Sequence, residues 1–139
     1  MAVKYTKFQD LSLEEKKEVL NWRNHPEIRK YMYNKKIISF KEHLQFIKSL
    51  KENKNKIYLK VEDLGVVNFL IKDDLVEVGI HKTPNKKKVG TILIEFALKY
   101  AFEMLKAKKI VLFVYENNKK AINLYKKFGF KTINKKDNL

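Results

Sequence analysis

The sequence predicts an α/β (α+β) fold in which one mixed, mainly antiparallel twisted sheet is flanked by about four helices. Three observations predict it. Two segments with helical spacing come first, three segments with the two-residue alternation of strands follow, and two helix–strand pairs end the chain. The 139 residues, 45% of them hydrophobic, are expected to form one domain over residues 1–139, because no repeat, linker or low-complexity segment divides them.

The N-terminal third is expected to hold a short edge strand and two capped helices. Residues 3–8 alternate weakly in polarity, as an edge strand does. Residues 12–15 (Ser-Leu-Glu-Glu) and 39–42 (Ser-Phe-Lys-Glu) have the capping-box pattern that begins a helix. Pro26 disfavours helical geometry in the residue before it, so the first helix should end there, and Pro26 can itself open a short helical turn.

The middle of the chain is predicted to form an antiparallel meander. Its three strands are expected over residues 57–62, 66–71 and 75–81, with short turns between them. In the third strand one set of alternate side chains should face the core: Val76, Val78 and Ile80. The other set is then available for chemistry: Glu77, Gly79 and His81.

A basic turn and a helix follow this strand. Apolar residues recur at three- and four-residue spacing over residues 89–104, and Gly90 and Thr91 mark the beginning of the helix. The turn contains three consecutive lysines, Lys86 to Lys88. Free N–H groups of the first helical turn, the positive end of the helix dipole and these lysines would suit a phosphorylated ligand. A solvated basic loop is the alternative.

The C-terminal part is expected to add a strand, a helix and a short strand. Residues 109–115 form a nearly continuous apolar run, as expected of a strand covered on both faces. Asn118 should cap the last helix and Gly129 should end it. Residues 130–133 can form a final short strand, and residues 135–139 should fray.

Composition narrows the classes of function. The net charge is +15, but Arg23 and Arg29 are the only arginines, so the planar fork that reads guanine or phosphate is nearly missing. A basic surface, or a preference for an anionic small ligand, fits better than a nucleic-acid partner. The absence of cysteine excludes disulfides and thiolate nucleophiles, and with three scattered histidines no metal is expected. Without a membrane-length apolar run or a signal peptide, a cytoplasmic protein with no membrane partner is expected.

Two motifs and the element order resemble the GNAT acetyltransferases. Residues 118–130 (Asn-Lys-Lys-Ala-Ile-Asn-Leu-Tyr-Lys-Lys-Phe-Gly-Phe) match that family's Asn-x-x-Ala-x-x-Leu-Tyr-x-x-x-Gly-Phe signature throughout. Residues 85–90 (Asn-Lys-Lys-Lys-Val-Gly) stand where the family has its Gln/Arg-x-x-Gly-x-Gly/Ala acetyl-CoA loop, with Asn85 and Lys88 departing from the pattern. The resemblance covers almost the whole chain and implies the GNAT fold and an N-acetyltransferase that uses acetyl-CoA without a metal.

The N-terminal half is similar to the PseH family within the GNAT enzymes. The stretches that carry this similarity are residues 22–26 (Trp-Arg-Asn-His-Pro), 31–33 (Tyr-Met-Tyr) and 38–47 (Ile-Ser-Phe-Lys-Glu-His-Leu-Gln-Phe-Ile). This resemblance implies acetylation of the 4-amino group of a UDP-linked 4-amino-4,6-dideoxy-N-acetyl-altrosamine. The product belongs to pseudaminic acid biosynthesis, which supplies the sugar for flagellin glycosylation.

Two departures from the GNAT pattern lead us to expect differences in structure from that family. Lys88 replaces the first glycine of the loop, so a positive φ at this position would carry backbone strain. The chain also ends soon after Phe130, where the family adds another strand. The sheet should therefore be short by one strand or be completed by a partner chain, for instance in a homodimer.

The GNAT resemblance implies direct attack of a neutral amine on the thioester and assigns the residues that serve it. Tyr125 matches the family tyrosine beside the CoA sulfur and is the expected general acid, because a phenol with an unperturbed pKa of about 10 stays protonated. A core tyrosine is its alternative, and capping alone would explain Asn118. The expected cofactor contacts are Val78 and Ile80, where the strands should part together with Val114, and Lys86, Lys87, Lys88, Val89, Gly90, Thr91, Asn118 and Tyr125.

The general base is left open between two residues of one strand face. His81 lies nearest the strand end, where the acceptor should meet the cofactor, and histidine titrates in the useful range. Glu77 is the alternative and would act through water. Either side chain could also be an ordinary polar surface residue, and an acceptor amine that arrives neutral needs no dedicated base.

The PseH resemblance implies four further acceptor contacts besides His81. Arg23 would approach the UDP diphosphate, while Trp22 or Tyr33 would pack on uracil or sugar. His43 is a candidate contact for the nucleotide or sugar. Core packing for Trp22, helix capping for Arg23 and burial for His43 are the alternatives.

Three other functions stay open at this point. A protein or ribosomal-protein N-terminal acetyltransferase of the GNAT superfamily would need an open groove for a peptide. A lysine-rich nucleic-acid-binding module would bind DNA or RNA with strong salt dependence and would need no acetyl-CoA. A degenerate GNAT protein would bind CoA without activity.

Overall fold

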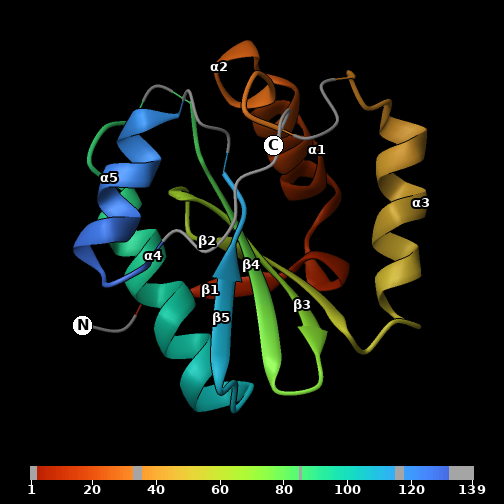
Figure 1. Cartoon of the computed structure of the whole chain (residues 1–139). Helices are drawn as coiled ribbons and strands as arrows, with labels where there is room; N and C mark the ends of the chain where they lie inside the picture. The colour runs from red at the N-terminus through yellow and green to blue at the C-terminus, as the bar shows by residue number, and fades with distance from the viewer. Residues whose placement is uncertain (1–2, 33–35, 85, 115–117, 132–139) are drawn as a thin grey trace.

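The computed structural model describes residues 3–32, 36–84, 86–114 and 118–131. Within them one five-stranded sheet has the order β1-β2-β3-β4-β5 (Figure 1). The strands are β1 Tyr5–Lys7, β2 Lys56–Val61, β3 Gly65–Lys72, β4 Leu75–Lys82 and β5 Lys109–Leu112. The first four strands pair antiparallel. Short turns join β2 to β3 and β3 to β4, whereas three helices separate β1 from β2 along the chain. Strand β5 lies parallel to β4, to which a helix connects it.

Five α-helices flank the sheet in the described residues, rather than about four. They are α1 Leu13–Asn24, α2 Pro26–Arg29, α3 Phe40–Leu50, α4 Gly90–Lys99 and α5 Lys119–Lys127. The additional helix is the single turn α2, which Pro26 opens as predicted. A 3₁₀ turn, Phe8–Asp10, follows β1, and a π-helical turn, Tyr100–Met104, extends α4. None of the described helices is long and apolar enough to cross a membrane.

Both predicted capping boxes are confirmed. The Ser12 hydroxyl accepts the Glu15 amide at 3.1 Å, and the Glu15 carboxylate accepts the Ser12 amide at 3.1 Å. Ser39 and Glu42 make the same reciprocal pair at 3.1 and 3.2 Å. Each box satisfies helix-end donors that would otherwise lack an intrahelical partner, which is why the sequence pattern located these two helix starts.

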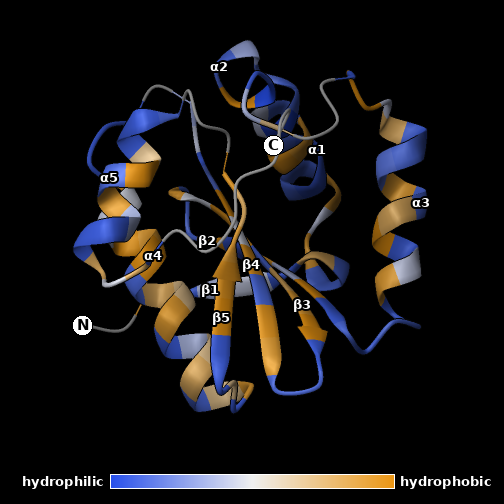
Figure 2. Ribbon diagram, in the orientation of Figure 1, coloured by the Kyte–Doolittle hydropathy of each residue, from blue (hydrophilic) through white to orange (hydrophobic). Residues whose placement is uncertain are grey.

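The sheet separates two hydrophobic clusters. Helix α4 covers one face, where Leu93 and Ala97 pack with Phe69 and Val76. Helices α1 and α3 cover the other face beside Val66. Figure 1 shows α4 and α5 on one side of the sheet and α1 and α3 on the other. Figure 2 shows hydrophobic residues along β4 and β5, between these two helical layers.

The C-terminal strands differ from the prediction. Strand β5 ends at Leu112, although the apolar run predicted a strand over residues 109–115 covered on both faces. Three of its four residues are only partly buried, because among the described residues β5 is the outermost strand and has no neighbour beyond it. Phe130 and Lys131 are not in a strand, and the rest of the predicted final strand and tail lies outside the described residues.

Candidate active site

Strands β4 and β5 part in the middle of β4. Their pairing runs from Leu75 opposite Lys109 to Val78 opposite Leu112 and stops there. Strand β4 continues to Lys82, paired only with β3. Alternate backbone groups over residues 79–82 therefore face a side on which the described chain places no strand, so they can hydrogen-bond a ligand. This agrees with the expected parting at Val78 to Ile80, and Val114 lies beyond the last residue of β5.

The loop after β4 retains the turn that a glycine normally makes. Lys88 has φ +64°, in the left-handed region, so a lysine occupies a backbone conformation that costs L-residues about 1–2 kcal/mol. In the described part of the chain no side chain caps α4, whose N-cap residue is Val89. The amide groups of Gly90 and Thr91 then lie in the first helical turn, where no intrahelical acceptor is available. This geometry suits an anionic ligand at the predicted cofactor loop.

Helix α5 rests against the beginning of α4. A Cβ atom at Gly90 would lie 2.9 Å from Leu124 Cδ2, so the absence of a side chain at Gly90 allows this close approach. The two predicted cofactor motifs, far apart in sequence, thus meet at one place. The N-cap of α5 is Asn118, whose Oδ1 accepts the Ala121 amide at 3.4 Å, as the capping alternative expected.

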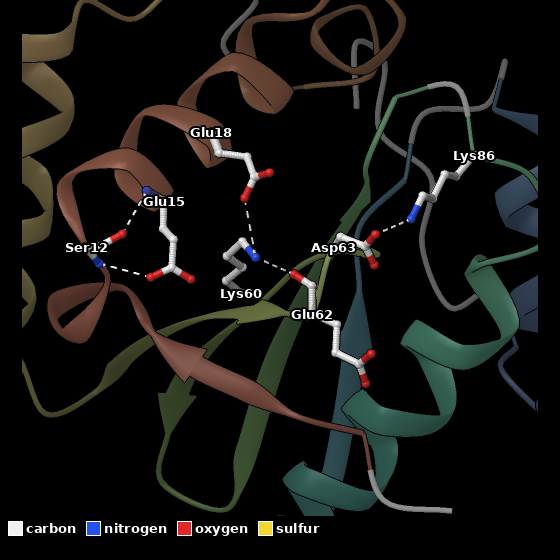
Figure 3. Close-up of polar contacts among 7 residues, drawn as sticks. All are labelled: Ser12, Glu15, Glu18, Lys60, Glu62, Asp63 and Lys86. Carbon is white, nitrogen blue, oxygen red and sulfur yellow. Dashed lines mark hydrogen bonds and ion pairs between the residues drawn. The ribbon is translucent and has the colours of Figure 1, made fainter.

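One of the three loop lysines already has an anionic partner. Lys86 Nζ lies 2.5 Å from Asp63 Oδ2 in the turn between β2 and β3, as Figure 3 shows. The hydrogen bond and the charge of Lys86 lower the pKa of the Asp63 carboxyl. Lys87 and Lys88 are exposed. Sequence reasoning missed Asp63, because the two residues are 23 positions apart and no local pattern connects them.

Tyr125 has the protonation state that a general acid needs. Its ring is half-buried, with its centroid 6.1 Å from that of Phe130. Burial raises the pKa of Tyr125 to about 12, because the phenolate would lose its hydration. The hydroxyl therefore keeps its proton at neutral pH. Its role as the acid for the thiolate stays a prediction.

His81 is neutral at physiological pH. Its pKa is lowered to about 4, first because burial disfavours the charged ring and then because Arg23 is positively charged. Nε2 of His81 is enclosed and meets no hydrogen-bond partner in the part of the chain that the structure describes. A neutral imidazole can accept a hydrogen bond from an amine, although a pKa this low makes it a weak base. The assignment of His81 as base stays a prediction.

Glu77 lines a cleft on the same face of the sheet. Its carboxylate lies 2.8 Å from Lys72 Nζ, so a lysine already balances its charge. The cleft has a volume of about 220 Å³ and opens beside the parting of β4 and β5. Its lining residues are Lys56, Tyr58, Asn68, Phe69, Leu70, Glu77, Val78, Gly79 and Phe113.

Arg23 belongs to a charged group that sequence reasoning found only in part. Burial and then the charge of Arg29 lower the pKa of Arg23, so the two arginines are electrostatic neighbours. Burial raises the pKa of Tyr58, and Arg23 opposes that shift. Arg23 is thus near Arg29, Tyr58 and His81 together. Arg29 and Tyr58 were missed, although Arg29 is the only other arginine and Tyr58 alternates with the core residues of β2.

Two predicted acceptor contacts lie in the core between the sheet, α1 and α3. Trp22 is 8% exposed, and Lys60 Nζ lies 5.5 Å from its ring centroid. His43 is 7% exposed, and its Nε2 bonds the carbonyl oxygen of Lys16 at 2.9 Å. Burial lowers the pKa of His43. These positions favour the structural alternatives, and substrate contact stays a prediction for both. Tyr33 lies outside the described residues.

Within the described ranges, no group of three or more histidine, cysteine, aspartate or glutamate residues is placed to hold a metal ion. The donors that the site does offer are backbone amides, lysines, arginines and neutral hydrogen-bonding groups. Such donors suit anionic organic ligands.

Comparisons with known proteins show which family has this sequence and this fold. A model of the acetyltransferase (GNAT) family matches residues 16–130. The acetyltransferase PseH of Campylobacter jejuni is 38% identical over 133 residues, which are 92% of this chain and 84% of that protein. The crystal structure of Campylobacter jejuni N-acetyltransferase PseH has a TM-score of 0.82 at 31% identity and covers 97% of this chain and 92% of its own. The same enzyme in complex with acetyl coenzyme A has a TM-score of 0.81 at 30% identity, with 98% and 93% covered.

Proposed function

The chain belongs to the GNAT acetyltransferase family, and from that premise we propose that it acetylates the 4-amino group of a UDP-linked amino-dideoxy sugar. The protein is an N-acetyltransferase, and acetyl-CoA is its cosubstrate. The 38% identity to the acetyltransferase PseH over 92% of this chain is the observation that carries the acceptor class. The charges of Arg23 and Arg29 act on each other near His81 and support it. Two neighbouring guanidinium groups suit a diphosphate, because each can donate two parallel hydrogen bonds to phosphate oxygens.

In the proposed complex the cofactor and acceptor meet at the parting of β4 and β5. The pyrophosphate of acetyl-CoA binds the amides and lysines of residues 86–91. The pantetheine arm follows the unpaired edge of β4, with the thioester beside Val78 to Ile80. The acceptor reaches the thioester through the cleft that Glu77 and Tyr58 line.

The reaction is a direct transfer. The neutral amine attacks the thioester carbon, the new C–N bond forms, and the C–S bond breaks as the tetrahedral intermediate collapses. Backbone N–H groups near Ile80 stabilise the oxyanion. The amine proton passes to His81, or to Glu77 through water, while Tyr125 gives its proton to the CoA thiolate and regains one from solvent.

The proposed function also implies a pathway, a cellular location and a possible oligomeric state for the enzyme. The product would enter pseudaminic acid biosynthesis and flagellin glycosylation, and the enzyme would be located in the cytoplasm. A homodimer is compatible with β5, whose outer edge is unpaired in the described residues, because an unpaired edge can accept a strand from a partner.

Thermal stabilisation tests the cosubstrate and the acceptor separately. Acetyl-CoA at 100 times its Kd should stabilise the folded protein by about 2.7 kcal/mol, and UDP or a UDP-amino-sugar should raise the melting temperature further. A shift with acetyl-CoA and none with UDP compounds would exclude the nucleotide sugar. If the enzyme then acetylated peptide N-termini, its function would be that of a protein N-terminal acetyltransferase. No shift at millimolar acetyl-CoA would mean that the altered loop does not hold the cofactor, and would favour the nucleic-acid-binding module instead.

Substitution of Tyr125 by Phe tests the proposed acid. The ring packing on Phe130 is retained and only the hydroxyl is lost. The turnover number should fall by about 10²–10⁴-fold, as expected when a general acid is removed, with little change in the Kd for acetyl-CoA. Because the pKa of Tyr125 is about 12, the wild-type rate should not decline through loss of this proton below about pH 11. A Tyr125→Phe variant with wild-type turnover would assign Tyr125 to the core instead.

A further inference from the structure

A row of three residues crosses the floor of the cleft. Tyr58 on β2 pairs with Asn68 on β3, and Asn68 pairs with Gly79 on β4. All three line the cleft, which opens one residue past the last paired position of β4, Val78. Asn68 therefore lies on the floor of the cleft within one strand of the place where the thioester is proposed to lie.

Gly79 leaves the space that the Asn68 amide occupies. A Cβ atom at Gly79 would lie 2.5 Å from Asn68 Oδ1 and 2.9 Å from Asn68 Nδ2, both too close for any real side chain. The amide group of Asn68 therefore lies over the α-carbon of Gly79 on β4, the strand that parts from β5. A larger residue at either position would change where this amide lies.

The Asn68 amide is available for a ligand. In the part of the chain that the structure describes, no hydrogen bond to the Asn68 side chain is formed, and the residue is only partly buried. An amide offers two donors and one acceptor without a net charge. Its neighbours in the cleft include Glu77, which is paired with Lys72, so Asn68 is a neutral hydrogen-bonding group whose capacity is not used by any of the described residues.

We propose that Asn68 is a specificity-determining residue that hydrogen-bonds a neutral substituent of the acceptor sugar, a hydroxyl or an acetamido group next to the reacting amine. This proposal rests on the proposed nucleotide-sugar function. The hydrogen bond orients the sugar so that its amine faces the thioester. It also favours a hydroxyl- or amide-bearing acceptor over a cationic one, since Arg23 would repel a cation near the same face.

Binding to three uridine nucleotides tests the role without turnover. The affinities of UDP, UDP-glucose and UDP-N-acetylglucosamine are measured by titration calorimetry for the wild-type protein and for Asn68→Leu, whose side chain has the same branching and number of heavy atoms but no hydrogen-bonding group. The wild type should bind at least one UDP-sugar more tightly than UDP, and Asn68→Leu should lose that gain by about 10- to 100-fold while its UDP affinity stays within twofold. The sugar that loses most identifies the hydroxyl or the acetamido group.

Gly79→Ala tests the role of Asn68 independently, because the added Cβ must displace the Asn68 amide without removing it. It should lose the same sugar-dependent gain, and adding Gly79→Ala to Asn68→Leu should cost little more. A melting curve for each variant checks that it is folded. Sugar affinities in Asn68→Leu equal to those of the wild type would overturn the role of Asn68 and leave the proposed function in place. If the wild type bound none of the three nucleotides, the nucleotide-sugar function itself would fail, and the proposal with it.

Discussion

The backbone conformation or the pKa of several single residues in this site is determined by the residues around them. Lys88 has the left-handed backbone of the loop, which the family pattern assigns to glycine. His81 and Tyr125 are both shifted by burial in the direction that keeps them neutral. Neutral side chains suit a reaction in which a neutral amine attacks and a thiolate must be protonated.

Replacement of Lys88 by Gly should stabilise the protein. Glycine removes the left-handed cost of about 1–2 kcal/mol but adds about 0.4–1 kcal/mol of unfolded-state entropy, so the free energy of unfolding should rise by about 0.5–1 kcal/mol. Denaturant titration measures it. Lys106 has φ +57° outside the loop and is the matched control. Lys106→Gly should stabilise similarly, whereas Lys88→Gly alone should weaken acetyl-CoA binding, because it removes a charge from the loop. Equal acetyl-CoA affinities in the two variants would contradict a role for the Lys88 charge.

The pKa of His81 predicts part of the acid sensitivity of the fold. Between about pH 6.5 and pH 4 the unfolded chain binds a proton at this histidine that the folded protein does not, so stability falls as the pH falls through that window. His81→Asn should lose less stability than the wild type between pH 7 and pH 4.5, as measured by urea unfolding. The carboxylates titrate alike in both proteins and cancel in the difference. Parallel losses in the two proteins would mean that His81 is protonated in the fold.

At the scale of elements, the site depends on where two strands stop pairing and where two helices meet. Strand β4 continues for four residues, 79 to 82, after its pairing with β5 ends. Helix α5 packs on the start of α4 through Leu124. The turn between β2 and β3 also reaches the cofactor loop, since Asp63 holds Lys86 and the Leu64 carbonyl accepts the Thr83 amide at 2.8 Å. The loop is thus connected to the sheet from two directions.

Neutralising Asp63 should strengthen cofactor binding. The Asp63 carboxylate competes with the cofactor phosphates for the Lys86 ammonium, so Asp63→Asn should lower the Kd for acetyl-CoA a few-fold. Stability should change by no more than about 1 kcal/mol, because an exposed ion pair contributes little. Asp73→Asn makes the same charge change in the turn between β3 and β4 and should leave the Kd unchanged. Weaker binding in Asp63→Asn would mean that the ion pair positions the loop for the cofactor.

At the scale of the whole molecule, the net charge of +15 favours anionic ligands. Acetyl-CoA and a UDP-sugar are both anionic, and a positive field raises the rate at which such ligands associate. The charge comes mostly from lysine, which attracts anions without the planar geometry of arginine. The two arginines are instead electrostatic neighbours of each other, on the face proposed for the acceptor.

Salt should therefore reduce the rate of association with both substrates. The Debye length falls from about 10 Å at 0.1 M to about 3 Å at 1 M ionic strength, so kcat/KM should fall several-fold across this range while kcat changes little. Steady-state kinetics at several salt concentrations measures this, and melting temperatures at the same concentrations check the fold. A salt-independent kcat/KM would exclude steering. Tight, salt-dependent DNA binding without any acetyl-CoA affinity would restore the nucleic-acid-binding alternative.

Sequence alone determined the features that depend on local pattern. The capping boxes at Ser12 and Ser39, the break at Pro26 and the end of the last helix at Gly129 each depend on neighbouring residues, and all four were predicted correctly. The family signature in residues 118–130 identified the enzyme class for the same reason, since it is one contiguous motif.

Only the tertiary structure decided which distant residues meet and how they ionise. Folding brings separate elements together, so that Asp63 pairs with Lys86 and the Asn68 amide lies against Gly79. It also places Arg23 where its charge lowers the pKa of His81. No short-range periodicity encodes such contacts. The same folding encloses Nε2 of His81 and buries Trp22, so the pKa of the first residue and the packing of the second depend on surroundings that the chain acquires only when it folds.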